Sequence, residues 1–236
     1  MYGFPRRTLA RPRRYRQLRY FDAFQFGSPR CWWAVDAPII GTHGTVVGFY
    51  DKTSRSGSLL LTSGTTPSLE STPFGYGVRI YNRVFSASWI SITGNDQRTI
   101  LFVNYPTFVD TWIVASPIYW YGNLFFALRR GVYRYQRGPS YMDFSYIVIG
   151  SLQTSPQIVC MTYDGSVLSV YDNGSLVATA TIDLSSSSGS FSIGSFSGAG
   201  TVRSNYCFFE CVVYPHVLDA NTIADITSLL LAQYRM

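Results

Sequence analysis

Seven arginines lie within the first nineteen residues of the chain, and no acidic residue precedes Asp22. A guanidinium group pairs with phosphate through two hydrogen bonds and stacks on bases, whereas a lysine ammonium acts as a point charge. Lys52 is the single lysine of the chain, so the choice of arginine favours nucleic acid over a membrane surface as the partner. The predicted phosphate-binding residues are Arg6, Arg7, Arg11, Arg13, Arg14, Arg16 and Arg19.

Residues 128–138, with the sequence LRRGVYRYQRG, form a second basic cluster. Its arginines are Arg129, Arg130, Arg134 and Arg137. In one extended strand, Arg130 and Arg134 share a face and the other two arginines share the opposite face. The plain interpretation is a solvated hairpin. The functional one is a surface that extends the phosphate-binding path, with neighbouring tyrosines available to stack on bases.

The positive charge belongs to the N-terminal segment alone. The net charge of the chain is +6, of which the first nineteen residues carry +7. A short segment of like charges that also contains Pro5 and Pro12 repels itself and is predicted to be disordered without a partner. With 47% hydrophobic and 14% charged residues, the remainder can bury a large core. We therefore predict an arm over residues 1–20 and a single domain over 21–236.

Catalytic chemistry has few candidate residues in this sequence. Glu70 and Glu210 are the only glutamates, and they do not form the closely spaced acid cluster of glycosidases on β-sandwich folds. No Gly-x-Ser-x-Gly elbow is present, and His43 and His216 are the only histidines. We predict that the chain is not an enzyme.

Metal and cofactor sites are equally sparse, and no cofactor is predicted. Asp164 and Asp172 could ligate Ca²⁺ at the rim of a sandwich, although aspartate before glycine or asparagine is first of all turn chemistry. The four cysteines have no zinc-ligand spacing and are predicted to be reduced and buried. If residues 207–211 form one strand, Cys207 and Cys211 share a face and lie too far apart to bridge.

The composition predicts an all-β fold. Tyrosine, phenylalanine, serine and glycine are abundant, and short apolar or alternating runs are separated by turn residues. The segment from Asp219 to Tyr234 is the one good helix, because its apolar residues recur at steps of three and four. Residues 62–73 are predicted to form a loop. Strands are predicted near residues 44–50, 58–61, 77–81, 89–92, 99–104, 111–115, 119–128, 146–149, 191–196 and 207–214.

The strongest local pattern is residues 157–182, QIVCMTYDGSVLSVYDNGSLVATATI. Asp164-Gly165 and Asn173-Gly174, each flanked by alternating apolar residues, predict two type I′ hairpins. Together with residues 207–219, this segment resembles the laminin G-like or concanavalin A-like jelly-roll family over about residues 145–232. The resemblance implies an antiparallel jelly-roll sandwich, a fold that serves lectins, glycosidases, adhesive modules and virion proteins.

A low-charge jelly-roll body with an arginine-rich arm resembles the capsid proteins of small viruses, especially those with single-stranded DNA genomes. This resemblance implies a homo-oligomeric shell that packages nucleic acid without sequence specificity, and a virion location without a secretion signal or membrane partner. The alternative is a non-catalytic glycan-binding module of laminin G-like type, for example in a phage fibre or an adhesin. A third hypothesis is a cellular nucleic-acid-binding or membrane-surface protein in which the arm makes the functional contact.

Overall fold

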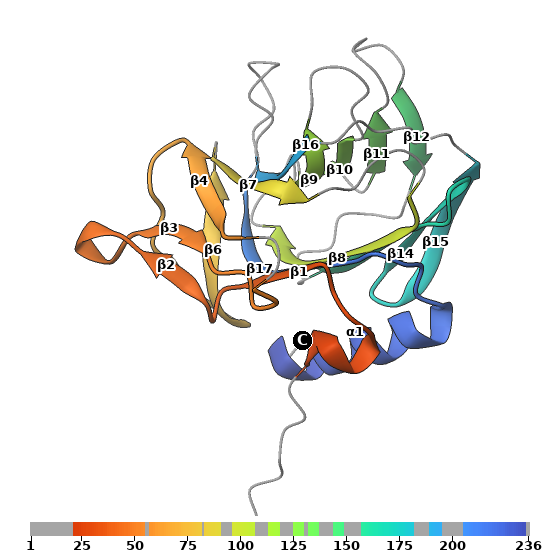
Figure 1. Cartoon of the computed structure of the whole chain (residues 1–236), viewed down its shortest axis with the longest axis horizontal. Coiled ribbons are helices and arrows are strands. Elements are labelled where there is room, and N and C mark those ends of the chain that lie inside the picture. Colours follow the sequence, from red (N-terminus) through yellow and green to blue (C-terminus); the bar gives the residue numbers. More distant parts are fainter. Residues whose placement is uncertain are drawn as a thin grey trace, which may run out of the picture.

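Two antiparallel sheets and one α-helix make up the layers of the part of the molecule that the structure describes (Figure 1). In this computed structural model, the first sheet lies between the second sheet on one side and α1 on the other. The predicted all-β sandwich with one C-terminal helix is confirmed. The structure describes residues 21–54, 57–81, 83–90, 96–106, 113–118, 125–129, 132–136, 144–148, 157–181, 189–194 and 205–234.

Sheet A contains eight strands in the order β15-β14-β13-β8-β17-β6-β5, and β1 also pairs with β17. The long strand β17 pairs with β8 on one side and with both β6 and β1 on the other. The strands are β1 (Cys31–Ala34), β5 (Leu69–Thr72), β6 (Gly75–Tyr81), β8 (Arg98–Pro106), β13 (Gln157–Tyr163), β14 (Val167–Asp172), β15 (Ser175–Thr181) and β17 (Asn205–Tyr214).

Sheet B contains nine strands in the order β12-β11-β10-β9-β16-β7-β4-β3-β2. They are β2 (Pro38–Ile40), β3 (Val46–Phe49), β4 (Leu59–Ser63), β7 (Val84–Ile90), β9 (Ile113–Ile118), β10 (Phe125–Arg129), β11 (Val132–Gln136), β12 (Phe144–Val148) and β16 (Gly189–Gly194). The helices are α1 (Ala220–Tyr234) and two short 3₁₀ turns, η1 (Ala23–Phe26) and η2 (Thr42–Gly44).

Strand β8 shows why sheet A is apolar on both faces. Ile100 and Phe102 pack into the core between the sheets, while Leu101 and Val103 pack into a second core on the outer face. All four are buried, and each such burial stabilises the fold by about 1.5–3 kcal/mol. A central strand covered on both faces therefore reads as a continuous apolar run.

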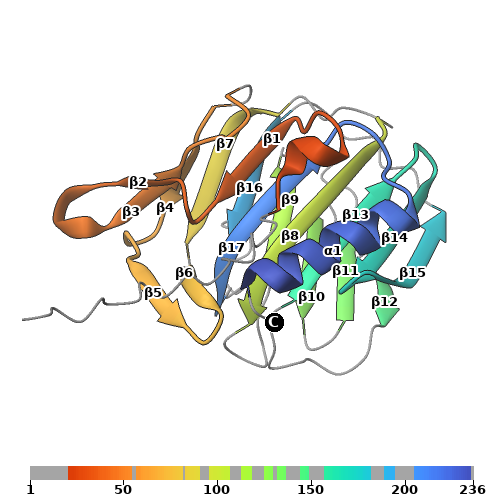
Figure 2. The same ribbon diagram turned by 90° about the horizontal axis from the view of Figure 1, so that it is seen from below.

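Helix α1 covers the outer core of sheet A (Figure 2). The predicted apolar stripe is buried, with Ile223, Ile226 and Leu230 all 0% exposed. Asp219 caps the helix, because its Oδ1 accepts the backbone N–H of Thr222 at 2.9 Å. This hydrogen bond also lowers the pKa of Asp219. In the part of the chain that the structure describes, no helix is long and apolar enough to cross a membrane.

Of the two predicted type I′ turns, one is confirmed and one is shifted along the chain. Asn173 and Gly174 have φ values of 47° and 83°, as a type I′ turn requires at both central positions. In the other hairpin, Asp164 N–H donates to Val167 O, so the central residues are Gly165 and Ser166. Positive φ occurs only at Gly165, which is the pattern of a type II′ turn.

Replacing Asn173-Gly174 with Val-Val is expected to destabilise the protein. Each β-branched residue with positive φ costs about 1–2 kcal/mol, and the Asn173 Oδ1 that accepts the Ile158 N–H at 3.0 Å is also lost. We therefore expect the melting temperature to fall by several degrees. Ser175→Val, an exposed position next to the turn, is the control in the same thermal scan. An unchanged melting temperature of the double variant would contradict the turn assignment.

All four cysteines are buried and free, as predicted, but the predicted shared face of Cys207 and Cys211 is wrong. The register of β17 against β8 shifts between Phe208 and Glu210. This β-bulge moves Cys211 into the core between the sheets, whereas Cys207 lies in the outer core. The predicted loop at residues 62–73 is also wrong in part, because it contains strand β5.

Candidate functional site

The β6 patch is a group of partly exposed side chains on the outer face of sheet A. Its residues are Glu70, Phe74, Arg79, Tyr81 and Tyr105. The β5–β6 hairpin brings Glu70 next to Arg79, and Tyr81 follows two residues later on the same face of β6. Figure 2 shows α1 crossing β8 and β13 and leaving β5 and β6 outside its span.

Strand β17 links the two halves of this patch. Cys207 of β17 pairs with Arg79 on one side and with Tyr105 of β8 on the other. The three residues therefore occupy one row across the sheet. Phe74, in the turn between β5 and β6, packs its ring against that of Tyr105, with centroids 5.2 Å apart. The patch is thus assembled from the β5–β6 hairpin and from β8, which β17 holds side by side.

An ion pair lies at the centre of the β6 patch. Arg79 Nε donates to Glu70 Oε2 at 2.7 Å, and the two side chains are 38% and 34% exposed. This hydrogen bond raises the pKa of Arg79. Tyr81 is 44% exposed. The patch therefore presents a fixed set of donors and acceptors beside tyrosine rings, and water can reach both.

Gly77 occupies a position at the base of the β6 patch where there is no room for a side chain. A Cβ at this position would lie 3.1 Å from Cβ of Cys207 and 3.3 Å from the Phe209 ring. Glycine therefore allows Phe209 to pack directly against the backbone of β6. Because the Gly77 position is covered from within the protein, a bound molecule would contact the side chains on either side of it.

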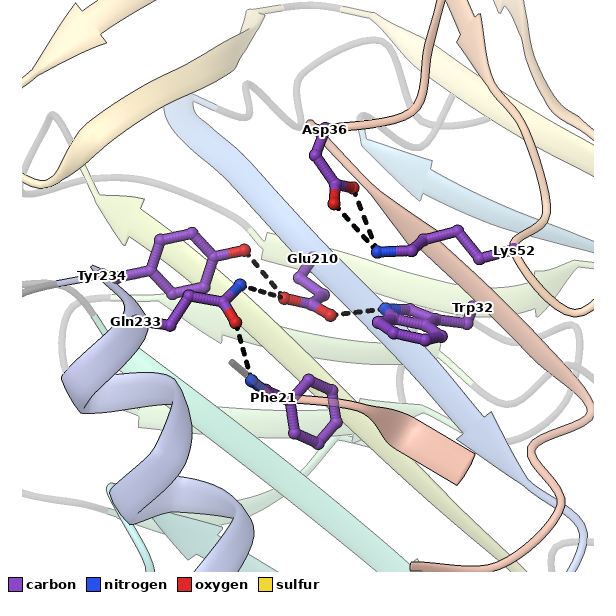
Figure 3. Close-up of polar contacts among 7 residues, drawn as sticks. All are labelled: Phe21, Trp32, Asp36, Lys52, Glu210, Gln233 and Tyr234. Carbon is purple, nitrogen blue, oxygen red and sulfur yellow. Dashed lines mark hydrogen bonds and ion pairs between the residues drawn. The ribbon is translucent and has the colours of Figure 1, made fainter. Parts of the chain in front are cut away.

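A second polar cluster surrounds Glu210 and is shown in Figure 3. Glu210 is 0% exposed and accepts hydrogen bonds from Trp32 Nε1 and from the Tyr234 hydroxyl, the latter at 2.7 Å. Gln233 Nε2 is 3.4 Å from the same carboxylate, and Gln233 Oε1 accepts the backbone N–H of Phe21 at 3.0 Å. The cluster connects β1, β17 and the end of α1 with Phe21, the first residue after the predicted N-terminal arm.

Burial raises the pKa of Glu210 to about 7, although the hydrogen bonds from Tyr234 and Trp32 act in the opposite direction. Lys52 lies outside the cluster, 3.8 Å above the Trp32 ring, and pairs with Asp36 at 2.9 Å. Glu210 therefore has neutral hydrogen-bond donors around it and no cation in direct contact among the contacts drawn in Figure 3. We assign this cluster a structural role, because water does not reach the carboxylate.

None of the arginines that the sequence predicts to bind phosphate belongs to the β6 patch. The seven arginines of the arm are outside the described residues, as are Arg130 and Arg137. Arg129 ends β10 and Arg134 lies in β11 of sheet B. The two strands form a hairpin in which Arg129 pairs with Val132, and Ala127 pairs with Arg134.

This hairpin corrects the predicted face assignment of the second basic cluster. Residues that pair directly occupy the same face of a sheet, and so do alternate residues along a strand. Arg129, Val132 and Arg134 therefore occupy positions of one face, whereas a single extended strand would place Arg129 on the face opposite to Arg134. The difference arises because the chain reverses between the two residues and does not continue as one strand.

The two aspartates considered as calcium ligands lie at opposite ends of β14, so they do not share a site. Asp164 Oδ1 accepts the backbone N–H groups of Ser166 and Val167, which lowers the pKa of Asp164. Burial raises the pKa of Asp172. Within the described ranges, no group of three potential metal ligands occurs.

No protein-family model matches the chain, and no curated protein matches it by sequence. Solved structures do match. Domain 4 of AbnA, an extracellular arabinanase from Geobacillus stearothermophilus solved in complex with arabinotriose, aligns with a TM-score of 0.62 at 13% identity. The alignment covers 85% of this chain and 98% of that domain. The chain has a jelly-roll fold.

Two longer proteins contain the same fold. The binding domain of botulinum neurotoxin serotype D aligns with a TM-score of 0.61 at 9% identity, over 86% of this chain and 51% of that one. A GH54 α-L-arabinofuranosidase aligns with a TM-score of 0.65 at 11% identity, over 80% and 51%. The chain thus spans about half the length of these two. At such low identity, the similarity establishes the fold alone.

Sequence reasoning missed the β6 patch. The sequence presents Glu70 only as a candidate catalytic acid and gives Tyr81 and Tyr105 no predicted role. A local signal was available, because Pro73-Phe74-Gly75 is a turn sequence between two short runs. A hairpin there would have placed Glu70 near Arg79. The position of Tyr105 has no such signal, because it depends on the pairing of β17 with β8.

Proposed function

We propose that the chain is a non-catalytic glycan-binding module whose ligand contacts the β6 patch. The observation that carries this proposal is the partly exposed Glu70–Arg79 pair, which lies beside the exposed Tyr81 and in the same row of sheet A as Tyr105. A viral shell that packages nucleic acid is the second candidate function.

The chemistry of the patch suits an oligosaccharide. A sugar ring presents hydroxyl groups that both donate and accept, and Arg79 and Glu70 supply several donors and acceptors in a fixed geometry. A sugar also presents an apolar C–H face, which packs on an aromatic ring with a polar edge such as tyrosine. Because the two charges of the patch are already paired, a neutral sugar fits better than an acidic one.

The comparison with domain 4 of AbnA supports the proposal in one respect. That domain has the same fold over almost its whole length and was solved with arabinotriose bound. The jelly-roll architecture is therefore compatible with binding of a neutral oligosaccharide. The position of the site on this chain rests on the β6 patch and not on the comparison.

The test combines a glycan screen with variants of the patch. We expect the purified chain to bind neutral oligosaccharides, arabinotriose among the probes, and Tyr81→Ala to weaken the best binder at least about tenfold in isothermal titration calorimetry. Arg79→Met should do the same, because it keeps the aliphatic stem and removes the donors.

Tyr50→Ala is the matched control, because Tyr50 is 57% exposed and lies outside the patch, directly after β3. It should leave the affinity unchanged. Equal losses in the Tyr50 and Tyr81 variants, or no glycan binding at all, would rule out the β6 patch as a glycan site. Circular dichroism of each variant separates loss of binding from loss of fold.

A second candidate function is nucleic-acid binding by the arm, in the setting of a viral shell. One specific observation favours it, namely the seven arginines before residue 20 on a body that is otherwise near neutral. Electron microscopy of the purified protein, with the absorbance ratio at 260 and 280 nm read before and after a high-salt wash, tests it. Closed particles with retained nucleic acid would support a capsid. Nucleic-acid-free monomers or small oligomers would contradict the capsid and leave the glycan-binding module as the one candidate.

A further inference from the structure

Strand β15 is the free edge of sheet A opposite to β5. It is seven residues long, Ser175–Thr181, and has no proline and no charge. Leu176 is 55% exposed, and Thr179 and Thr181 are also exposed. Among the described strands, only β14 pairs with it. One side of its backbone therefore presents N–H and C=O groups for which the described strands provide no partner.

Three of the other edges of the described sheets carry features that prevent a further strand from adding, and the fourth, β12, has five residues against the seven of β15. Strand β5 has four residues between Pro67 and Pro73 and contains the charged Glu70. Strand β2 has three residues and begins with Pro38. The free side of β1 is covered, because Trp32 O accepts the N–H of Lys52. Short length, proline, charge and cover are the usual means of protecting an edge. Strand β15 has none of these four features, although a β-bulge at Val177 interrupts its pairing with β14.

We propose that β15 pairs with β15 of a second copy of this chain, antiparallel about a two-fold axis, so that the two copies of sheet A form one continuous sheet. The absence of charge on β15 suits this partner, because an uncharged strand that pairs with itself brings no like charges together. A partner of opposite charge would find no counter-charge on β15. This inference is independent of the glycan-binding proposal.

The sequence of β15 also suits a two-fold axis at Thr179. With the axis there, Thr179 lies opposite its own copy, Ala178 opposite Ala180, and Val177 opposite Thr181. Threonine pairs and pairs of β-branched residues are favourable cross-strand neighbours, and the alanines leave the two backbones free to approach. On the core side, Ala178, Ala180 and Val177 already pack against the core between the sheets.

Cross-linking of the full chain with Thr179→Cys tests the arrangement. Cα atoms of directly opposed residues in antiparallel strands are about 4.5–5.5 Å apart, which is within the range of a disulfide. We expect mild oxidation to convert most of this variant into a covalent dimer. The natural cysteines are all buried and should give no background. Ala224→Cys, an exposed position on α1, is the matched control and should remain monomeric on a non-reducing gel.

Sedimentation of the Thr179→Lys/Thr181→Lys variant provides a second readout. The added lysines face one another and the strand across the axis, so the dimer should dissociate at a concentration at least about tenfold higher than that of the natural chain. Each variant is first checked for an unchanged circular dichroism spectrum. A natural chain that is monomeric throughout, equal cross-linking of the two cysteine variants, or a dimer unaffected by the two lysines would overturn the proposal.

Discussion

Replacing Glu210 with glutamine is expected to make the free energy of unfolding less dependent on pH between pH 5 and 8 than it is in the natural chain. Glu210 is fully buried among Trp32, Tyr234 and Gln233, and burial raises its pKa to about 7 from an ordinary value of 4.5. Glutamine has nearly the same shape and can keep contacts with Trp32 and Tyr234 without a charge.

The sign follows from proton binding. Between pH 4.5 and 7 the folded protein holds a proton on Glu210 that the unfolded chain has released, so the free energy of unfolding falls as the pH rises through this window. The full difference corresponds to about 3 kcal/mol. At pH 5 the natural chain and Glu210→Gln should therefore differ little. At pH 8 the variant should be the more stable protein by up to about 3 kcal/mol.

Urea unfolding at pH 5, 6, 7 and 8 measures this effect, and the difference between the two proteins at each pH isolates Glu210 from other titrating groups. Glu70→Gln is the control, because it removes a carboxylate that is 34% exposed and should change the free energy of unfolding by less than about 1 kcal/mol at every pH. A constant difference between the natural chain and Glu210→Gln over the whole range would refute this account.

Deletion of residues 1–19 is expected to lower the affinity for single-stranded DNA by about a thousandfold or more at low salt. Each arginine that neutralises a phosphate releases a counterion, and seven of them give an expected slope of log K against log salt of about −5 for a single strand. The deletion removes this contribution of counterion release to the binding free energy. It should leave the body folded, because the buried Phe21 and its hydrogen bond to Gln233 are retained.

Fluorescence anisotropy with a labelled oligonucleotide, at several salt concentrations, provides the measurement. A full-length variant in which the seven arginines are glutamines separates the effect of charge from that of length and should bind as weakly as the deletion. A slope that stays near −5 after the deletion would move the binding site to the body, where Arg129 and Arg134 are the residues to replace next. An unfolded truncated chain would show that the arm is part of the fold.

The elements that the sequence predicts well are those specified by local patterns. The hairpin at Asn173-Gly174 is confirmed because both its turn residues and the flanking alternation lie within ten residues of one another. The helix from Ala220 is confirmed because Asp219 and the apolar stripe determine where it begins and which face is buried. In both cases the information lies within the element itself.

Features that depend on distant strands could not be predicted in this way. The strand Cys31–Ala34 has no alternation, because all four of its residues are buried, and only its pairing with β17 defines it. The bulge between Phe208 and Glu210 reverses the face of Cys211 and leaves no mark in the spacing of the cysteines. The β6 patch likewise exists only because β17 brings Tyr105 next to Arg79.

The central position of β17 determines when this protein can fold during its synthesis. Strand β17 begins at Asn205 and separates β8 from β6 in sheet A. Until it leaves the ribosome, the strands from β15 to β8 and the pair β6–β5 have no common neighbour, and the facing edges of β8 and β6 remain open. Such long-range pairing slows folding and exposes edges that aggregate. A nascent chain that ends before residue 205 would therefore expose both of these edges, and sheet A can close only after β17 has emerged.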